Sequence, residues 1–285
     1  MILIADSGST KTHWRLVDDK KNIHQFSTVG FNPYFNDAQQ IEVEIKKDLI
    51  PEIITKGINL TDVRIFYYGA GCSSDEKCGI VKEALSSCFK DSSIEIDHDL
   101  LGAARAICGN EKGIAAIVGT GSNSCYYDGI NIVENVPSLG YILGDEGSGA
   151  HIGKTFLHAY FNKELPAHIA ENFNTRNKLS REDILNAIYK KPMPSRFLAS
   201  FSKFIFQNIN DKYLENLVEK CFVEFFERQI CKYSEHTRVK MGCVGSVAFY
   251  YSKILKRVAE QKGVVIDKII ESPVAALTLY HIENA

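Results

Sequence analysis

The first residues of this sequence that could do chemistry follow a short apolar run. Residues 2–4 predict a buried strand that ends at Asp6. The next six residues combine small size, hydroxyl groups and one positive charge: Ser7, Gly8, Ser9, Thr10, Lys11 and Thr12. An extended, β-rich pattern then resumes through Trp14 and Leu16. The stretch is a strand, a turn and a second strand, and it lacks both the Gly-Lys-Ser/Thr ending and the following helix of a P-loop.

Such a turn carries the groups that hold phosphate. Backbone amides at its tip can form an anion-binding nest, its four hydroxyl side chains can donate hydrogen bonds, and Lys11 adds a positive charge. Asp6 could hold a hydrated Mg²⁺, which takes one or two carboxylates together with phosphate. An ordinary hairpin in which Gly8 supplies a positive φ is the alternative interpretation.

The same design recurs about 110 residues later. An apolar strand over residues 114–118 leads into a second small-residue turn, and an alternating strand follows. That turn consists of Gly119, Thr120, Gly121 and Ser122. More strands and then helices follow each copy, so the sequence predicts two related halves that each present a phosphate-binding hairpin.

Three polar positions have both a structural and a functional interpretation. Asp99 lies where a strand over residues 94–96 meets a helix over 100–108, so it could cap that helix or act as a general base. Asn32 precedes Pro33 in a loop, where it could form an Asx turn or contact a ligand. Asp145 stands beside a second acid and three glycines, which fits either a helix start or a close approach to a ligand.

A third glycine turn comes late in the chain. Residues 242–246 follow a short strand and open an amphipathic helix, and Gly242, Gly245 and Ser246 would allow close backbone approach to a planar base or a ribose. Residues 165–237 predict helices, including two long ones over 196–209 and 212–233 whose aromatic stripes indicate core. A helix is also predicted over 38–56, with a break at Pro51.

Composition excludes several classes of protein. The apolar fraction is 45%, the charged fraction is 24% and the net charge is −2, so we expect a soluble globular protein that binds neither nucleic acid nor membranes. The sequence contains no long apolar run and no charged leader, which predicts a cytoplasmic location. The eight cysteines have neither zinc-site nor redox-pair spacing, so we expect reduced thiols.

Four motifs together resemble the sugar-kinase, actin and heat-shock-chaperone superfamily, and within it the N-acetylglucosamine kinase and BadF/BadG-type ATPase branch. They are Asp6-Ser-Gly-Ser-Thr-Lys-Thr12, Gly119-Thr-Gly-Ser-Asn123, Gly144-Asp-Glu-Gly-Ser148 and Val244-Gly-Ser-Val247. The resemblance implies an α/β fold of two ribonuclease-H-like lobes, each with a mixed five-stranded sheet and helices, that close on ATP. It implies an N-terminal lobe of residues 1–109, joined by a closing helix over 273–285, and a C-terminal lobe of 110–272 with a helical insertion over 165–237.

The resemblance also implies roles for individual residues. The Asp6–Thr12 turn is similar to the first phosphate loop, with Asp6 near Mg²⁺, and Gly119 to Ser122 is similar to the second. Gly242, Gly245 and Ser246 fall on the adenosine side. Asp99 falls where the family has its catalytic aspartate. Asn32, Gly140 and Asp145, with Asp99, fall where the kinases hold the sugar.

The function that follows is an ATP- and Mg²⁺-dependent kinase of an amino sugar, with N-acetylglucosamine as the first candidate. The partner is then a small-molecule sugar, and a homodimer is possible by analogy with relatives. Two alternatives stay open. One is a BadF-type ATPase that couples ATP hydrolysis to a partner protein, and the other is a sugar sensor or scaffold without catalysis.

Overall fold

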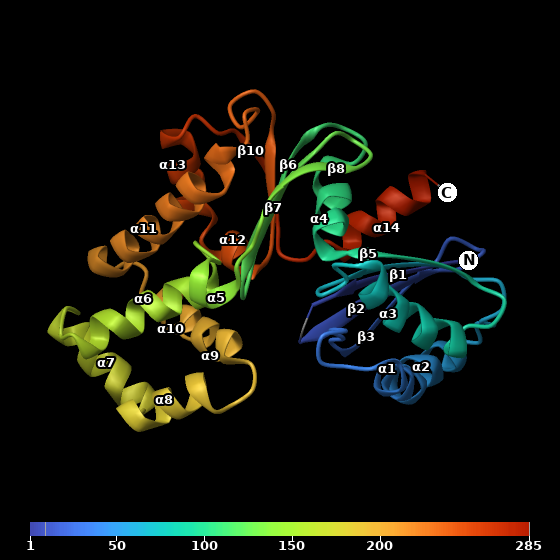
Figure 1. Cartoon of the computed structure of the whole chain (residues 1–285), viewed down its shortest axis with the longest axis horizontal. Coiled ribbons are helices and arrows are strands. Elements are labelled where there is room, and N and C mark those ends of the chain that lie inside the picture. The colour runs from blue at the N-terminus through green and yellow to red at the C-terminus, as the bar shows by residue number, and fades with distance from the viewer. Residues whose placement is uncertain (9, 285) are drawn as a thin grey trace. The chain divides into compact units, whose positions relative to one another are not determined.

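A computed structural model describes residues 1–8 and 10–284. Ser9, expected in the first phosphate turn, lies outside the described residues. The chain divides into two units. The first unit comprises Met1–Asn110 and the segment from Ser272 onward, and the second comprises Glu111–Glu271. Each unit has its own sheet and its own apolar core, so each is described by itself (Figure 1).

The sheet of the first unit has the strand order β3-β2-β1-β4-β5. Its strands are β1 (Ile2–Ser7), β2 (Lys11–Val17), β3 (Ile23–Val29), β4 (Arg64–Gly69) and β5 (Ser93–His98). β1 pairs antiparallel with β2 and parallel with β4. β1 forms because Leu3, Ile4 and Ala5 are apolar on both faces and are completely buried at the centre of the sheet.

The sheet of the second unit repeats this topology. Its order is β10-β9-β6-β7-β8, from the strands β6 (Gly113–Val118), β7 (Ser122–Tyr127), β8 (Ile132–Val136), β9 (Met241–Val244) and β10 (Ile266–Ile270). β6 pairs antiparallel with β7 and parallel with β9, as β1 does with β2 and β4. Two mixed five-stranded sheets of equal connectivity confirm both the predicted fold class and the predicted internal repeat.

A helical layer covers one face of the first sheet and buries the chain's single tryptophan. The layer consists of α1 (Ala38–Glu44), η1 (Ile45–Leu49), α2 (Ile50–Thr55) and α3 (Asp75–Cys88). Trp14 and Leu16 of β2 pack into the core that these helices form with the sheet. The break expected at Pro51 is instead a π-helical turn over η1. Pro51 then stands in the first turn of α2, where its lack of a backbone N–H leaves no hydrogen bond unmade.

The other face of the first sheet is covered by α4 (Asp99–Cys108) and the C-terminal helix α14 (Val274–Glu283). The ring of His281 on α14 stacks on Phe66, with centroids 3.8 Å apart. Arg105 on α4 donates to the hydroxyl of Tyr68 at 2.6 Å, and that hydroxyl lies 2.9 Å from Nε2 of His281. A neutral imidazole therefore links α4, the sheet and α14 in one buried network.

The second unit carries most of the helices. They are α5 (Gly140–Leu143), α6 (Gly149–Phe161), α7 (Ala167–Asn177), α8 (Arg181–Tyr189), α9 (Pro194–Ser200), α10 (Ser202–Gln207), α11 (Lys212–Arg228), η2 (Ile230–Lys232), α12 (Ser246–Tyr250) and α13 (Ser252–Gln261). Phe204, Phe222 and Phe225 are buried in one core, as their helical spacing predicted. The predicted long helices are shorter, because 196–209 divides into α9 and α10 and α11 ends at Arg228.

The cysteines and the helix lengths add two general observations. All eight cysteines are free thiols, four of them buried and four partly buried. Within the described ranges, no helix combines the length and the apolar character needed to span a bilayer.

The network at His281 predicts acid sensitivity in the first unit. Burial, with help from the charges of Arg105 and Arg64, lowers the pKa of His281 from 6.5 to about 4. Below about pH 6.5 the imidazole of His281 is therefore protonated in the unfolded chain but stays neutral in the folded chain. The free energy of unfolding falls as the pH drops toward 4, by at most about 3 kcal/mol. His281→Phe keeps the stacking on Phe66 and should flatten this pH dependence.

Fluorescence of Trp14 reports unfolding of this unit, because Trp14 is the only tryptophan and lies in its core. The measurement is the free energy of urea unfolding at several values between pH 7 and pH 4. His158→Phe, at an exposed histidine of α6, is the matched control. An unchanged pH dependence in His281→Phe would contradict the prediction.

Candidate functional site

The first turn is closed by its own hydrogen bonds. The amide of Gly8 donates to the carbonyl of Lys11 at 3.0 Å. The hydroxyls of Ser7 and Thr12 lie 2.7 Å apart, and both side chains are completely buried. Ser7 Oγ also accepts from the amide of Phe31 at 3.3 Å. The hydroxyls of Ser7 and Thr12 thus join the strand ends to the next loop, and their predicted role as phosphate donors stays a prediction.

Thr10, Lys11 and Gly8 are exposed at the tip of this turn. They are therefore the described residues of the predicted first phosphate loop that a ligand can reach. Asp6, one residue before Ser7, is only partly buried and ends the apolar part of β1 as expected.

The structure brings Asp6 and Asp99 near one another within the first unit. Burial raises the pKa of Asp6 to about 7, and the negative charge of Asp99 adds to that rise, while a hydrogen bond from Ser272 at 3.5 Å opposes it. Burial likewise raises the pKa of Asp99, and the charge of His98 and the amides at the start of α4 oppose the rise. Burial thus raises the pKa of both carboxyl groups, and only Asp99 is opposed by a nearby positive charge, that of His98.

Asp99 does not cap its helix. The cap is His98, whose Nδ1 accepts from the amide of Leu101 at 3.2 Å, and Asp99 is the first helical residue. The sequence-based alternative of a capping role for Asp99 is therefore wrong. Because an imidazole is an uncommon helix cap, residue preferences alone pointed to the acid instead.

The second turn is fixed to the acidic loop that follows it. Its Gly119 amide donates to the carbonyl of Gly121 at 2.9 Å. The amide of Ser122 donates to Asp145 Oδ1 at 3.3 Å, and the hydroxyl of Ser122 donates to the carbonyl of Glu146 at 2.7 Å. The side chain of Ser122 is buried and holds the acidic loop, and its predicted contact with the nucleotide stays a prediction.

The glycines of the acidic loop serve packing. α6 begins with Ser148 as its cap, so neither acid caps it. A Cβ on Gly147 would lie 2.8 Å from Cβ of Phe225, and one on Gly149 would lie 3.0 Å from Cβ of Ala199. The missing side chains let α11 and α9 approach the loop closely, and the expected close approach of a ligand stays a prediction.

Asp145 itself is buried and conformationally unusual. Its side chain is 7% exposed and its φ is +56°, a backbone conformation that non-glycine residues rarely adopt. Ser138 Oγ donates to Asp145 Oδ1 at 2.9 Å. Burial raises the pKa of Asp145, whereas the hydrogen bonds from Ser138 and Ser122 oppose the rise. Strained, buried acids of this kind occur preferentially at functional sites.

A pocket of about 650 Å³ lies within the second unit. Its lining joins the second turn, the start of α12 and the helices α9 and α10: Gly119, Thr120, Arg196, Ala199, Ser200, Ser202, Lys203, Phe206, Gln207, Ser246, Val247, Tyr250 and Tyr251. Three residues predicted to bind a nucleotide, Gly119, Thr120 and Ser246, therefore meet in one place. Among the lining residues, all within the described part of the chain, two are cationic and none is acidic.

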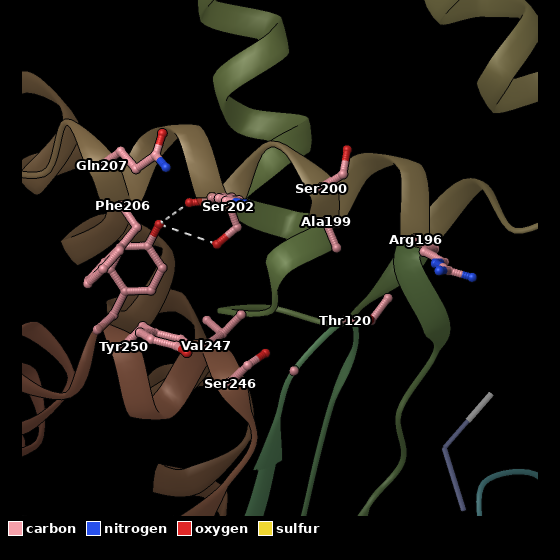
Figure 2. Close-up of a pocket in the computed structure, with 13 residues that line it drawn as sticks. Thr120, Arg196, Ala199, Ser200, Ser202, Phe206, Gln207, Ser246, Val247 and Tyr250 are labelled. Atoms are coloured by element: carbon pink, nitrogen blue, oxygen red, sulfur yellow. Dashed lines mark hydrogen bonds between the residues drawn. The ribbon is translucent and has the colours of Figure 1, made fainter. Parts of the chain in front are cut away.

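The two ends of the pocket differ in chemistry. Figure 2 shows Arg196 and Thr120 toward one end and the aromatic side chains of Phe206 and Tyr250 toward the other. The rings of Phe206 and Tyr250 are 5.3 Å apart at an angle of 60°. Sequence reasoning missed the whole wall formed by α9 and α10, because an aromatic helix with scattered cations carries no signal beyond core packing.

The third glycine turn packs against the end of β6, which leads into the second turn. Gly245 has a φ of +122°, and a Cβ there would lie 2.4 Å from the carbonyl oxygen of Val118. Ser246 then opens α12 and lines the pocket. Gly242, by contrast, is buried inside β9 and does not line the pocket, and its predicted contact with a nucleotide stays a prediction.

Two predicted sugar contacts, Asn32 and Gly140, are not among the residues that line the pocket. Asn32 Oδ1 accepts from the amide of Tyr34 at 3.0 Å, so the Asx-turn interpretation is correct for its side-chain oxygen. Gly140 has a φ of +71° and opens α5 beside Ser138. The structure holds each in a defined turn.

A protein-family model described as the BadF/BadG/BcrA/BcrD ATPase family matches residues 5–275. The chain belongs to this family. Membership of an ATPase family implies that the chain uses ATP, in agreement with the second turn and the pocket beside it. The family predicted from the four motifs is therefore confirmed.

Similar proteins extend this finding. A crystal structure of a candidate N-acetylglucosamine kinase from Porphyromonas gingivalis is 40% identical, with a TM-score of 0.93 over 100% of this chain and 99% of that one. A curated N-acetylmuramic acid/N-acetylglucosamine kinase from Clostridium acetobutylicum is 27% identical over 239 residues, which are 79% of this chain and 75% of that protein. A candidate N-acetylglucosamine kinase from Chromobacterium violaceum shares the fold, with 14% identity, a TM-score of 0.79 and 98% of each chain covered.

The contact at Gly245 predicts a severe effect of a single methyl group. Gly245→Ala adds both an unfavourable φ and a clash with Val118, whereas Gly263→Ala adds only the unfavourable φ, since its nearest neighbour would lie at 3.5 Å. We expect Gly263→Ala to cost about 1 kcal/mol of unfolding free energy and Gly245→Ala about 1–3 kcal/mol more. Gly245→Ala should also weaken ADP binding.

The measurements are calorimetric unfolding and calorimetric titration with ADP. Equal stability and equal ADP affinity in the two variants would mean that the second turn does not depend on the close approach of Gly245.

Proposed function

We propose that this protein is an ATP-dependent kinase that phosphorylates a hydroxyl group of an amino sugar, with N-acetylglucosamine as its first candidate substrate. The observation that carries the proposal is the pocket of the second unit, in which a phosphate-type turn meets cationic and aromatic side chains. The names of the Porphyromonas and Clostridium relatives support the choice of acceptor.

The pocket suits a nucleoside triphosphate. Its volume of about 650 Å³ falls within the range of small-molecule sites. Arg196 and Lys203 supply positive charge without an acid among the described lining residues, so an anion is favoured there. The aromatic end with Phe206 and Tyr250 suits a planar base, and the turn at Gly119 and Thr120 suits the phosphates.

Asp6 and Asp99 fit a magnesium ion. Two neighbouring carboxyl groups with raised pKa values are stabilised by a nearby cation, and Mg²⁺ binds proteins through one or two carboxylates plus phosphate. The described residues contain no group of three or more metal-ligating side chains, which agrees with so small a donor set. Asp6 would hold the ion, and the ion would neutralise phosphate charge when bound.

Asp99 is the proposed general base. It would accept the proton of the sugar hydroxyl while that oxygen forms a bond to the γ-phosphorus of ATP. The bond between the γ-phosphorus and the bridging oxygen breaks, and ADP leaves with the electron pair. The start of α4 suits this role, since its amides favour the ionised carboxylate while burial keeps the group basic.

Asp145 and Asn32 are the proposed sugar contacts, with Gly140 beside Asp145. Asp145 is ordered by hydrogen bonds before any substrate binds, so it can accept from a sugar hydroxyl at little entropic cost. The Clostridium relative acts on both N-acetylmuramic acid and N-acetylglucosamine by its name, so both belong in the first test.

ADP release from Mg·ATP tests the reaction class. The purified protein should release ADP slowly without sugar and much faster with one of N-acetylglucosamine, glucosamine, N-acetylmuramate, N-acetylmannosamine or glucose. Steady ADP release that no sugar changes would contradict a sugar kinase and would favour an ATPase that acts on a partner protein.

Asp99→Asn removes the proposed base while keeping its shape. We expect kcat to fall by about 100- to 10,000-fold with the affinity for ADP nearly unchanged. Asp97→Asn, at the neighbouring acid of β5, is the matched control and should stay close to the wild type. A near-normal kcat in Asp99→Asn would remove Asp99 from the mechanism.

Arg196→Ala removes one of the two cations of the pocket. We expect the affinities for ADP and ATP to fall about tenfold and that for adenosine to stay the same, because the guanidinium would contact phosphate only. Arg181→Ala, at an exposed arginine of α8 outside the pocket lining, is the control. An equal loss for adenosine would show that Arg196 supports the pocket rather than the phosphates.

A further inference from the structure

The carboxyl group of Asp145 is held by one oxygen only. Oδ1 accepts from Ser138 Oγ at 2.9 Å and from the Ser122 amide at 3.3 Å. Within the described residues, Oδ2 accepts no hydrogen bond, and it lies where a Cβ on Gly121 would come within 2.9 Å. Oδ2 is not fully buried, so it is the oxygen left for a ligand.

We propose that Ser138 is a positioning residue that aims Oδ2 of Asp145 at a hydroxyl of the sugar. The inference rests on the proposed function, in which Asp145 contacts the acceptor. It goes beyond that function because it states that Ser138, a residue outside the acidic loop, fixes the orientation of the Asp145 carboxyl group. The affinity for the sugar then depends on Ser138 as well.

The need for a positioning residue follows from the torsion of the carboxyl group. The terminal torsion of an aspartate is broad, so backbone strain at Asp145 fixes the position of the side chain but not the rotation of its oxygens. Two donors on the same oxygen fix that rotation. One of them, the amide of Ser122, belongs to the second turn, so the direction of Oδ2 is defined relative to the phosphate-type turn itself.

Of the two donors, Ser138 is the adjustable one. Its bond is the shorter, and it comes from a side chain, whereas the Ser122 donor is main chain. Ser138 also begins an exposed segment in which Leu139, Ile142 and Leu143 are 62%, 68% and 73% exposed. Because Ser138 is itself exposed, a change of its side chain should be tolerated by the fold.

The charges around Asp145 support a measurable pH effect. Glu146 of the same loop raises the pKa of Asp145, and Lys154 of α6 lowers it, while the Ser138 hydroxyl favours the ionised form. Loss of that hydroxyl would therefore raise the pKa of Asp145 further. The acid limb of kcat/KM for the sugar would then move to higher pH.

The test compares Ser138→Val with Ser138→Thr, which have nearly the same shape and differ in the hydroxyl group. The sugar is the one that stimulates ADP release most, with N-acetylglucosamine tried first. We expect Ser138→Val to raise KM for the sugar about tenfold, to move the acid limb upward and to leave KM for ATP unchanged. Ser138→Thr should restore wild-type behaviour, and equal melting temperatures would exclude a general loss of folding.

Asp145→Asn separates this inference from the proposed function. If Asp145→Asn raises KM for the sugar but Ser138→Val and Ser138→Thr behave alike, the role of Ser138 is overturned and Asp145 remains a sugar contact. If Asp145→Asn leaves KM for the sugar unchanged, both the sugar contact and the role of Ser138 are overturned. A rise of KM for ATP in Ser138→Val would likewise overturn the inference, since the effect would then belong to the phosphate-type turn.

Discussion

The architecture of the second unit depends on main-chain contacts around one turn, Gly119 to Ser122. Its Gly119 carbonyl accepts from the amide of Gly149 at 2.8 Å, and the preceding carbonyl, that of Val118, touches Gly245 where any Cβ would clash. Backbone can approach backbone this closely only where side chains are missing. The glycines of three distant motifs are therefore parts of one contact, and the pocket lies beside it.

In the first unit, by contrast, two candidate functional residues work against the stability of the fold. Asp6 and Asp99 are brought near one another although the charge of Asp99 raises the cost of ionising Asp6 and burial raises the pKa of both groups. The unit tolerates this pair because its two apolar faces are covered separately, with the Trp14 core on one side and the helices α4 and α14 on the other. The apolar layers on the two faces of the sheet stabilise the unit. The two carboxyl groups lie at the ends of strands, where a ligand can neutralise their charge.

The sheets and the repeat were predictable because they depend on local patterns. A strand buried on both faces, such as residues 114–118, is apolar along its whole length, and the small-residue turn after it recurs in the same context. Hydroxyl partners were not predictable in this way. Ser7 and Ser122 have the residue types of phosphate donors, but their partners Phe31 and Glu146 are each 24 residues away in the chain. Thr12 likewise donates to the carbonyl of Val29, 17 residues away, and only the fold brings these groups together.

The same argument explains why the pocket wall of α9 and α10 was missed. Its one trace in the sequence is a pair of glycines four residues apart, Gly149 and Gly153, which lie on one face of α6 and admit Ala199 and Leu198 of α9. The repeat is thus equal in topology and unequal in chemistry. In the first copy, Asp6 stands near the end of the strand. In the second copy Gly119 takes the place of the acid, and α9 and α10 add the cationic side chains of Arg196 and Lys203 beside the turn. Two copies of one hairpin can differ in this way because the sheet fixes only where a turn lies, and the residues packed against the turn decide what it can bind.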